Sequence, residues 1–146
     1  MARRSPKPGR KAGHQIHSGA SSAVHTVQLA PGDQNDRGVS VSLKYLRTET
    51  ECLSEWHRPE LKKLVQAIEK MRNMTVHELV VVSRLCSQHK YLPKLSRFVR
   101  PAGLGPDLPI YEIRVDRSNS ARMHGVFIDN VFHLIWLDKN HQVFAG

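Results

Sequence analysis

The chain has 146 residues, which is enough for one domain with a core of its own. Its 22 lysines and arginines exceed its 13 acids, and the formal net charge of +9 favours a polyanionic partner: RNA, DNA or an acidic protein. Two cysteines are too few for a disulfide framework, and no apolar run reaches the ~18 residues of a membrane span, so we expect a cytoplasmic protein and no membrane partner.

The first part of the chain, residues 1–38, is rich in glycine, serine, proline and basic residues and has no periodic apolar run. Such a composition buries too little surface to offset the entropy of ordering. The sequence therefore predicts a disordered basic tail over residues 1–38 and a folded domain over residues 39–146. The tail holds six lysines and arginines against two acids, which leaves 16 against 11 in the folded part.

The folded part begins with Val39–Tyr45, where apolar and polar side chains alternate as in a strand. Apolar residues then recur at helical spacing over residues 53–71. Within them, Pro59 either marks the first turn of a helix that begins at Arg58 or kinks a longer helix. The segment Thr75-Val-His-Glu78 has the pattern of a capping box and predicts a second helix from Thr75.

The segment Cys86-Ser-Gln-His89 has the spacing of half a zinc site. A second half would have to come from distant residues such as His57 or His77, and no pattern in the sequence pairs them with it. We therefore expect no metal and no cofactor.

A long connection, Ser87–Pro109, contains four prolines and two glycines among its 23 residues. A loop of this length is usually functional or disordered. Its basic side chains interleave with Tyr91 and Phe98, which suits single-stranded RNA whose bases stack on aromatic rings. The alternative is a solvated connector whose two aromatic side chains pack on the core. The basic residues are Lys90, Lys94, Arg97 and Arg100.

The last third of the chain predicts an antiparallel sheet. Residues 110–115 alternate, and residues 122–128 and 131–137 flank Asp129-Asn130, a pair suited to the positive backbone angles of a hairpin turn. That turn predicts a core face on which aromatic and aliphatic side chains oppose one another. The predicted pairs on this face are Phe127–Phe132, Gly125–Leu134 and Met123–Trp136.

The reverse face carries Arg114, Arg122, His124 and His133, side chains that can bind phosphate and transfer protons. Its predicted pairs are Val126–His133, His124–Ile135 and Arg122–Leu137. Exposed strand residues are often charged simply because they face water, and for the hairpin alone this alternative stays open. The face has no lysine, serine or threonine, and residues 138–141 follow the last strand beside it. We interpret it as a candidate RNA site.

Taken in order, a strand, two helices and an antiparallel sheet predict an α+β domain, with the N-terminal strand and both helices packed on a small twisted sheet. The charge-alternating strand 110–115, the arginine-bearing strand 121–125, the hydrophobic strand 131–137 and the polar end with Phe144 together resemble the RelE/HigB-type toxins of bacterial toxin–antitoxin systems. These toxins are small messenger-RNA endonucleases. The resemblance covers the element order from Val39 to Phe144, and it implies a RelE-like fold whose helices cover one sheet face and leave the other for RNA.

The resemblance further implies metal-independent cleavage, in which the 2′-hydroxyl attacks its own phosphate and leaves a 2′,3′-cyclic or 3′-phosphate. Its implied partners are messenger RNA, free or on the ribosome, and a cognate antitoxin protein. Arg114 matches the family's basic residue on the strand before the loop, and Arg122 matches an arginine that usually holds phosphate. Lys139 or His141 falls where a C-terminal basic or histidine residue acts.

Two residues depart from the family pattern. Phe144 stands where some members have a tyrosine, and Glu112 stands where others have a second lysine. The acid–base work then falls on His124 and His141, because an imidazole ordinarily titrates at a pH of about 6.5. The resulting catalytic set is Arg114, Arg122, His124 and His141, and the RNA-binding set is Lys90, Lys94, Arg97, Arg100 and Lys139. A non-catalytic RNA-binding or protein-interaction module on the same basic face remains the alternative.

Overall fold

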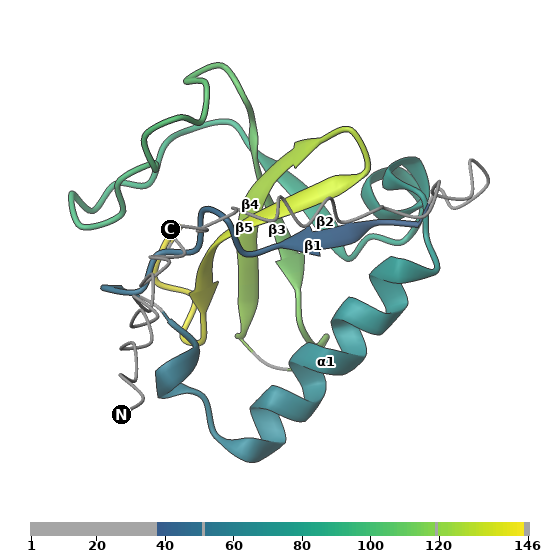
Figure 1. The fold of residues 1–146 in the computed structure, drawn as a ribbon. Coiled ribbons are helices and arrows are strands. Elements are labelled where there is room, and N and C mark those ends of the chain that lie inside the picture. Colours follow the sequence, from purple (N-terminus) through teal and green to yellow (C-terminus); the bar gives the residue numbers. More distant parts are fainter. Residues whose placement is uncertain (1–37, 51, 119, 145–146) are drawn as a thin grey trace, which may run out of the picture. The chain divides into compact units, whose positions relative to one another are not determined.

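The computed structural model describes residues 38–50, 52–118 and 120–144, so almost all of the predicted tail lies outside the described residues. The elements are β1 (Ser40–Ser42), η1 (Leu53–Glu55), α1 (Arg58–Arg72), η2 (Glu78–Val82), β2 (Cys86–His89), β3 (Ile110–Arg114), β4 (Arg122–Ile128) and β5 (Val131–Asp138). The strands form one mixed sheet in the order β1-β5-β4-β3-β2 (Figure 1), in which only β1 and β5 pair in parallel. The predicted α+β class is confirmed. Within the described ranges, no helix has the length and apolar character needed to cross a bilayer.

Helix α1 begins at Arg58, as the first reading of Pro59 predicted, and η1 is a separate 3₁₀ turn. Proline suits the first helical turn because its missing N–H would find no partner there in any case. The backbone N–H of His57 donates to the Glu60 carboxylate at 2.8 Å, which caps the helix start. Three side chains one turn apart then bury the inner face of the helix: Leu64, Ala67 and Met71.

The second predicted helix is present but short. The capping box is confirmed, since the Glu78 carboxylate accepts from the Thr75 N–H at 2.8 Å and the Glu78 N–H donates to the Thr75 hydroxyl at 3.2 Å. The helix is a single π-type turn, closed by the Ser83 N–H donating to the Glu78 carbonyl at 2.8 Å. Arg84 then takes a left-handed conformation with φ 56°, which ends the turn.

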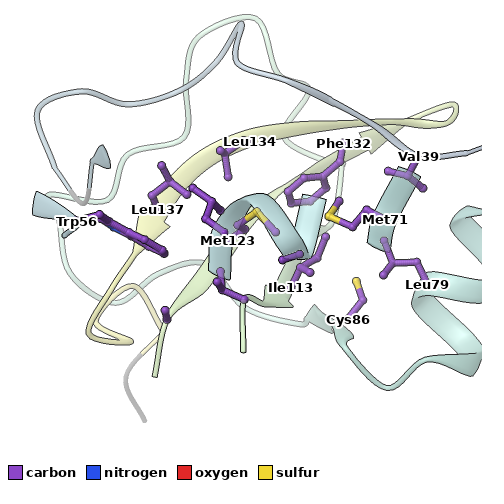
Figure 2. Close-up of a cluster of buried hydrophobic side chains, with 14 residues drawn as sticks. Val39, Trp56, Met71, Leu79, Cys86, Ile113, Met123, Phe132, Leu134 and Leu137 are labelled. Carbon is purple, nitrogen blue, oxygen red and sulfur yellow. The ribbon is translucent and has the colours of Figure 1, made fainter. Parts of the chain in front are cut away.

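One side of the sheet packs on these helices and forms what we call the helix-side core (Figure 2). Met71 of α1 and Leu79 of η2 are each 1% exposed and belong to one cluster with Ile113, Met123 and Phe132 of the sheet. The helices therefore cover one sheet face, as predicted.

The hairpin turn at Asp129-Asn130 is confirmed, with Asp129 at φ 55°. The predicted register holds from this turn as far as the pair Gly125–Leu134. His124 then lies opposite Trp136, so that Ile135 is an extra residue on β5 and forms a β-bulge. The three pairs predicted beyond this point are wrong: Met123–Trp136, His124–Ile135 and Arg122–Leu137.

The bulge directs Trp136 away from the helices into a second cluster on the reverse face of the sheet, which we call the loop-side core. Phe98 of the segment 90–109 packs edge-on against Trp136, with 5.9 Å between ring centroids. In Figure 1 this segment, in green, runs on the side of the sheet away from α1. The prediction that the reverse face lies open is therefore wrong, because an irregular segment covers much of it. The other buried members are Leu104, Ile110, Val126, Ile135 and Val143.

The predicted connection Ser87–Pro109 begins with strand β2, which pairs antiparallel with β3. Side chains alternate along a strand, so Cys86 and His89 lie on opposite faces. Cys86 is buried in the helix-side core (Figure 2), where burial first and the charge of Glu112 second raise the pKa of its thiol to about 12. Cys86 and His89 therefore do not form one half of a zinc site.

Candidate functional site

The carboxylate of Glu112, on β3, forms three ion pairs on the reverse face. Its Oε1 lies 3.0 Å from Nε of Arg122 on β4. Its Oε2 lies 3.1 Å from Nε2 of His89 on β2 and 3.4 Å from Nε2 of His141, which follows β5. We call these four residues the Glu112 cluster. Three strands and a turn bring together one carboxylate, one guanidinium and two imidazoles.

Strand pairing places most of the cluster. Glu112 lies opposite His124 on β4 and opposite Ser87 on β2, so its side chain shares a face with residues two positions away on either side strand. Arg122 and His89 are those residues. Each is partly buried, with side chains 11% and 21% exposed, while the Glu112 side chain is 9% exposed.

Asp138, the last residue of β5, shapes the turn that carries His141. Its carboxylate accepts hydrogen bonds from the backbone N–H of Gln142 at 2.7 Å and of Val143 at 2.9 Å. His141 itself has φ 55°, a left-handed conformation that costs a residue with a side chain free energy and recurs at functional sites. The turn thus holds the His141 imidazole against Glu112.

A buried pair lies behind the cluster: Nε2 of His124 is 3.1 Å from the Asp138 carboxylate, and both side chains are fully buried. Burial lowers the pKa of His124 and outweighs the hydrogen bond and charge of Asp138, which would raise it. Burial alone would raise the pKa of Asp138, but hydrogen bonds from His124, Gln142 and Val143 lower it. Near neutral pH the pair is therefore a neutral imidazole donating to a carboxylate.

The Glu112 carboxylate is ionised at any physiological pH. Burial by itself would raise its pKa, but the hydrogen bond from His89 and the charges of the neighbouring histidines outweigh burial and lower its pKa to about 2. The cluster reaches solvent through His141, whose side chain is 39% exposed. Phe144 closes the other side by stacking on the His89 ring, with 3.5 Å between centroids and 6° between planes.

Of the predicted catalytic residues, the structure brings Arg122 and His141 together on Glu112. His124 lies next to them, but it is fully buried and contacts Asp138. Arg114 is exposed and lies directly opposite Arg122 in the β3–β4 pair; it also lines a cavity of about 540 Å³ beside α1. His133 packs by Tyr45, with 5.5 Å between ring centroids, as a strand residue would.

The predicted RNA-binding residues divide into two groups. Lys90, Lys94 and Arg97 are exposed on the segment 90–109. Arg100 instead donates to the backbone carbonyls of Leu108, at 2.8 Å, and Gly105, and so ties that segment to itself.

Lys139, the fifth residue of that set, is joined to the start of α1. Its Nζ lies 3.2 Å from the Glu60 carboxylate and donates to the Glu55 carbonyl at 3.1 Å. The two aromatic residues of the segment 90–109 also divide: Phe98 is buried in the loop-side core, whereas Tyr91 is 83% exposed. The prediction that both rings pack on the core is therefore confirmed for Phe98 and wrong for Tyr91, and RNA binding by the segment stays a prediction.

The positions of His89 and Glu112 at the centre of this cluster were not predicted from the sequence. In the sequence, His89 is notable only for its spacing from Cys86. Glu112 is notable only because it departs from the pattern of the RelE/HigB-type toxins. The signal that could have found them is their position on the strands: both share the reverse face with Arg122 and His124 once β2 is recognised as a strand.

Replacing Glu112 with glutamine should remove a pH-dependent part of the stability. Because the folded-state pKa of about 2 lies below the ordinary value of 4.5, the ionised carboxylate stabilises the fold above pH 4.5, and this contribution is lost as the pH falls toward 2. We expect the difference in Tm between wild type and Glu112→Gln to shrink over that interval, measured by circular dichroism. The matched control is Glu69→Gln, on the exposed side of α1. A difference that stays constant down to pH 2 would contradict the assignment.

No protein-family model, curated protein or solved structure matches the chain. What the site does is therefore inferred from its own residues and their geometry.

Proposed function

We propose that the chain is a RelE-like toxin, a metal-independent endoribonuclease that cleaves messenger RNA. The observation that carries this proposal is the Glu112 cluster, in which two partly exposed imidazoles lie within 3.4 Å of one ionised carboxylate, beside Arg122. Two imidazoles and a cation are what cleavage of RNA through its own 2′-hydroxyl requires.

In the proposed reaction, one imidazole accepts the proton of the 2′-hydroxyl as its oxygen attacks the adjacent phosphorus. The bond from phosphorus to the 5′-oxygen breaks, and the second imidazole, protonated, donates its proton to that leaving oxygen. The products are a 2′,3′-cyclic phosphate and a free 5′-hydroxyl. His141 and His89 are the two imidazoles, because both are partly exposed and both contact Glu112.

The arginines and Glu112 have different parts in this scheme. Arg114 is exposed and lies opposite Arg122, so it can contact the phosphate directly. Arg122 donates to Glu112 and to the Ala121 carbonyl, and its charge lies next to the reacting group. Glu112 contacts both imidazoles through Oε2 and so orients them.

His124 acts in this proposal as a positioning residue rather than as an acid or base. It is fully buried and holds Asp138, whose carboxylate folds the turn that carries His141. His89 replaces His124 as the second acid–base residue of the predicted set. RNA would reach the cluster from the side of Tyr91, Lys90 and the neighbouring exposed cations.

Replacing His141 with asparagine should slow RNA cleavage by roughly 10²- to 10⁴-fold, because a general acid or base contributes about that much to rate. The purified full chain is incubated with single-stranded RNA in EDTA, alone and in a translating extract, and the ends are mapped. Wild type should leave cyclic phosphate ends and spare an RNA that carries a 2′-deoxynucleotide at the cut. Induced expression should arrest growth, and co-expression of a cognate antitoxin should relieve the arrest.

The matched control is His77→Asn, since His77 is exposed on the chain before η2. It should cleave at the wild-type rate. Intact RNA with folded wild-type protein, in buffer and in the extract, would overturn the proposal, as would equal rates for wild type and His141→Asn.

A second candidate function is a binding module without catalysis. The segment 90–99 exposes Tyr91, Leu92 and Leu95, with side chains 83%, 65% and 46% exposed, among Lys90, Lys94 and Arg97 and no acid. Aromatic stacking with nearby cations binds single-stranded RNA without regard to sequence. Under this alternative, Tyr91→Ala weakens RNA binding in a filter assay while wild type leaves the RNA uncut.

A further inference from the structure

We propose that His89, Glu112 and His124, with His141 beside them, form a binding site for a transition-metal ion of the zinc class. One ring nitrogen of His89, one of His124 and one carboxylate oxygen of Glu112 lie within 4.8 Å of one another. Imidazole nitrogen and carboxylate oxygen are donors that Zn²⁺ takes, whereas Ca²⁺ and Mg²⁺ require sets of oxygens. The proposed site thus differs from the prediction of no metal made from the sequence.

The donors already stand close to the spacing of a tetrahedral site. Two ligands that each lie about 2.1 Å from a tetrahedral Zn²⁺ are about 3.4 Å apart. Nε2 of His89 and Nε2 of His141 lie 3.1 and 3.4 Å from the same oxygen, Oε2 of Glu112. Arg122 occupies the other oxygen, Oε1, at 3.0 Å. Oε2 is therefore the oxygen left for the ion, with an imidazole nitrogen on either side.

His124 has the hydrogen bonding of a metal ligand without its metal. Its Nε2 is held by the Asp138 carboxylate at 3.1 Å, while its Nδ1 is buried and has no hydrogen-bond partner in the described part of the chain. A histidine that binds a metal through one ring nitrogen usually donates its other N–H to a carboxylate, which fixes the ring and its tautomer. An ion bound to Nδ1 would satisfy an atom that is otherwise costly to bury.

The surroundings fit a cation that can enter and leave. Glu112 and Asp138 supply two negative charges, which balance the ion beside Arg122. His141 is the outermost donor, with its side chain 39% exposed and placed on a turn. His89, Glu112 and His124 leave a fourth position on the ion, which His141 can fill from its exposed turn and which water takes when His141 moves away, so the site is exchangeable rather than closed.

The proposal of zinc binding depends on this geometry alone. The effect of zinc on RNA cleavage also depends on the proposed function. Zn²⁺ held by His89 and His141 takes the nitrogen lone pairs that would accept a proton. The zinc-bound chain is then an inactive form of the nuclease, and removal of the metal restores RNA cleavage.

The first experiment measures Zn²⁺ binding to the full-length chain, free of any affinity tag and treated with chelator, by isothermal titration calorimetry. Wild type should bind one tight equivalent, and His89→Gln should bind it roughly 100-fold more weakly or worse. His77→Gln is the matched control and should bind as wild type does. Since His14, His17 and His25 of the N-terminal segment can bind zinc weakly, the difference between variants is the quantity that counts.

Co²⁺ provides a second measurement that needs no variant. Bound at this site it should give the visible absorption of a tetrahedral nitrogen–oxygen complex, which Zn²⁺ bleaches as it displaces Co²⁺. Equal Zn²⁺ affinity in wild type and His89→Gln, or a Co²⁺ spectrum that stays octahedral, would overturn the site.

An RNA assay with and without Zn²⁺ separates the two proposals. Cleavage in EDTA that stops with one equivalent of Zn²⁺ supports both. Tight Zn²⁺ binding by a chain that cuts no RNA in either condition supports the metal site and overturns the nuclease. Cleavage that persists with excess Zn²⁺, together with failed binding, overturns the metal site alone.

Discussion

Replacing Asp138 with alanine should lower the free energy of unfolding by about 3 to 5 kcal/mol, because each of the two buried donors that it leaves without an acceptor costs about 1 to 3 kcal/mol. The Asp138 carboxylate accepts from Nε2 of His124 at 3.1 Å and from the backbone N–H of Val143 at 2.9 Å, and both donors are buried. Alanine offers neither donor an acceptor. Urea unfolding followed by circular dichroism measures the loss.

Asp138→Asn separates the hydrogen bonds from the charge. It keeps one acceptor oxygen, so we expect it to lose roughly half as much stability as the alanine variant. Asp107→Ala, at an exposed position on the segment 90–109, is the matched control and should change the unfolding free energy little. If the free energy of unfolding of Asp138→Ala lies within about 1 kcal/mol of the wild-type value, the buried hydrogen bonds do not hold the turn as described.

Replacing Gly125 with alanine should lower the free energy of unfolding by about 3 kcal/mol or more. A Cβ on Gly125 would collide with the backbone carbonyl oxygen of His133 and would stand 2.8 Å from Cζ of Phe132. The oxygen belongs to the paired strand, so it can move only if pairing at the bulge is disturbed. The Phe132 ring is fully buried and has little space into which to turn.

The same unfolding experiment tests this prediction. Gly105→Ala is the matched control, because a Cβ there would find its nearest neighbour, Cγ of Leu108, at 4.0 Å, an ordinary contact. It should unfold as wild type does. A folded Gly125→Ala protein of wild-type stability would mean that β4 and β5 approach each other less closely at the bulge.

The sequence predicted those parts of the fold that local chemistry determines. Pro59 and the capping box at Thr75 marked the two helix starts, and Asp129-Asn130 marked the hairpin turn. Near that turn, the alternation of apolar and polar residues determined the register, because only one pairing places the apolar side chains of both strands on the same face. These features depend on residues close in sequence, and no distant partner is needed to infer them.

The β-bulge at Ile135 could not be predicted from the alternation of apolar and polar residues. Residues 134–137 are four consecutive apolar residues, so alternation carries no information on which of them faces the helices. The sequence left open whether Phe98 packs on the core, because packing between distant segments has no local signature that would decide it.

The candidate site was predicted only in part, because some of its contacts also depend on packing between distant segments. Arg122 and His141 were named because their residue types suited phosphate chemistry, and the structure brings both to Glu112. His89 lies on β2, a strand of four residues with a mostly polar sequence that does not alternate, so its presence on the same face could not be inferred. His124 was expected at the surface, but the rings of His89 and Phe144 and the carboxylate of Asp138 lie against it, and it is fully buried.

The bulge also bears on how this hairpin could vary among relatives. Ile135 and Trp136 both face the loop-side core, so a strand lacking Ile135 would alternate regularly and still send Trp136 to the same face. Asp138 would still reach His124. A homologue one residue shorter at this point would therefore keep the whole site, whereas a deletion nearer the turn would exchange the two faces of the strand beyond it.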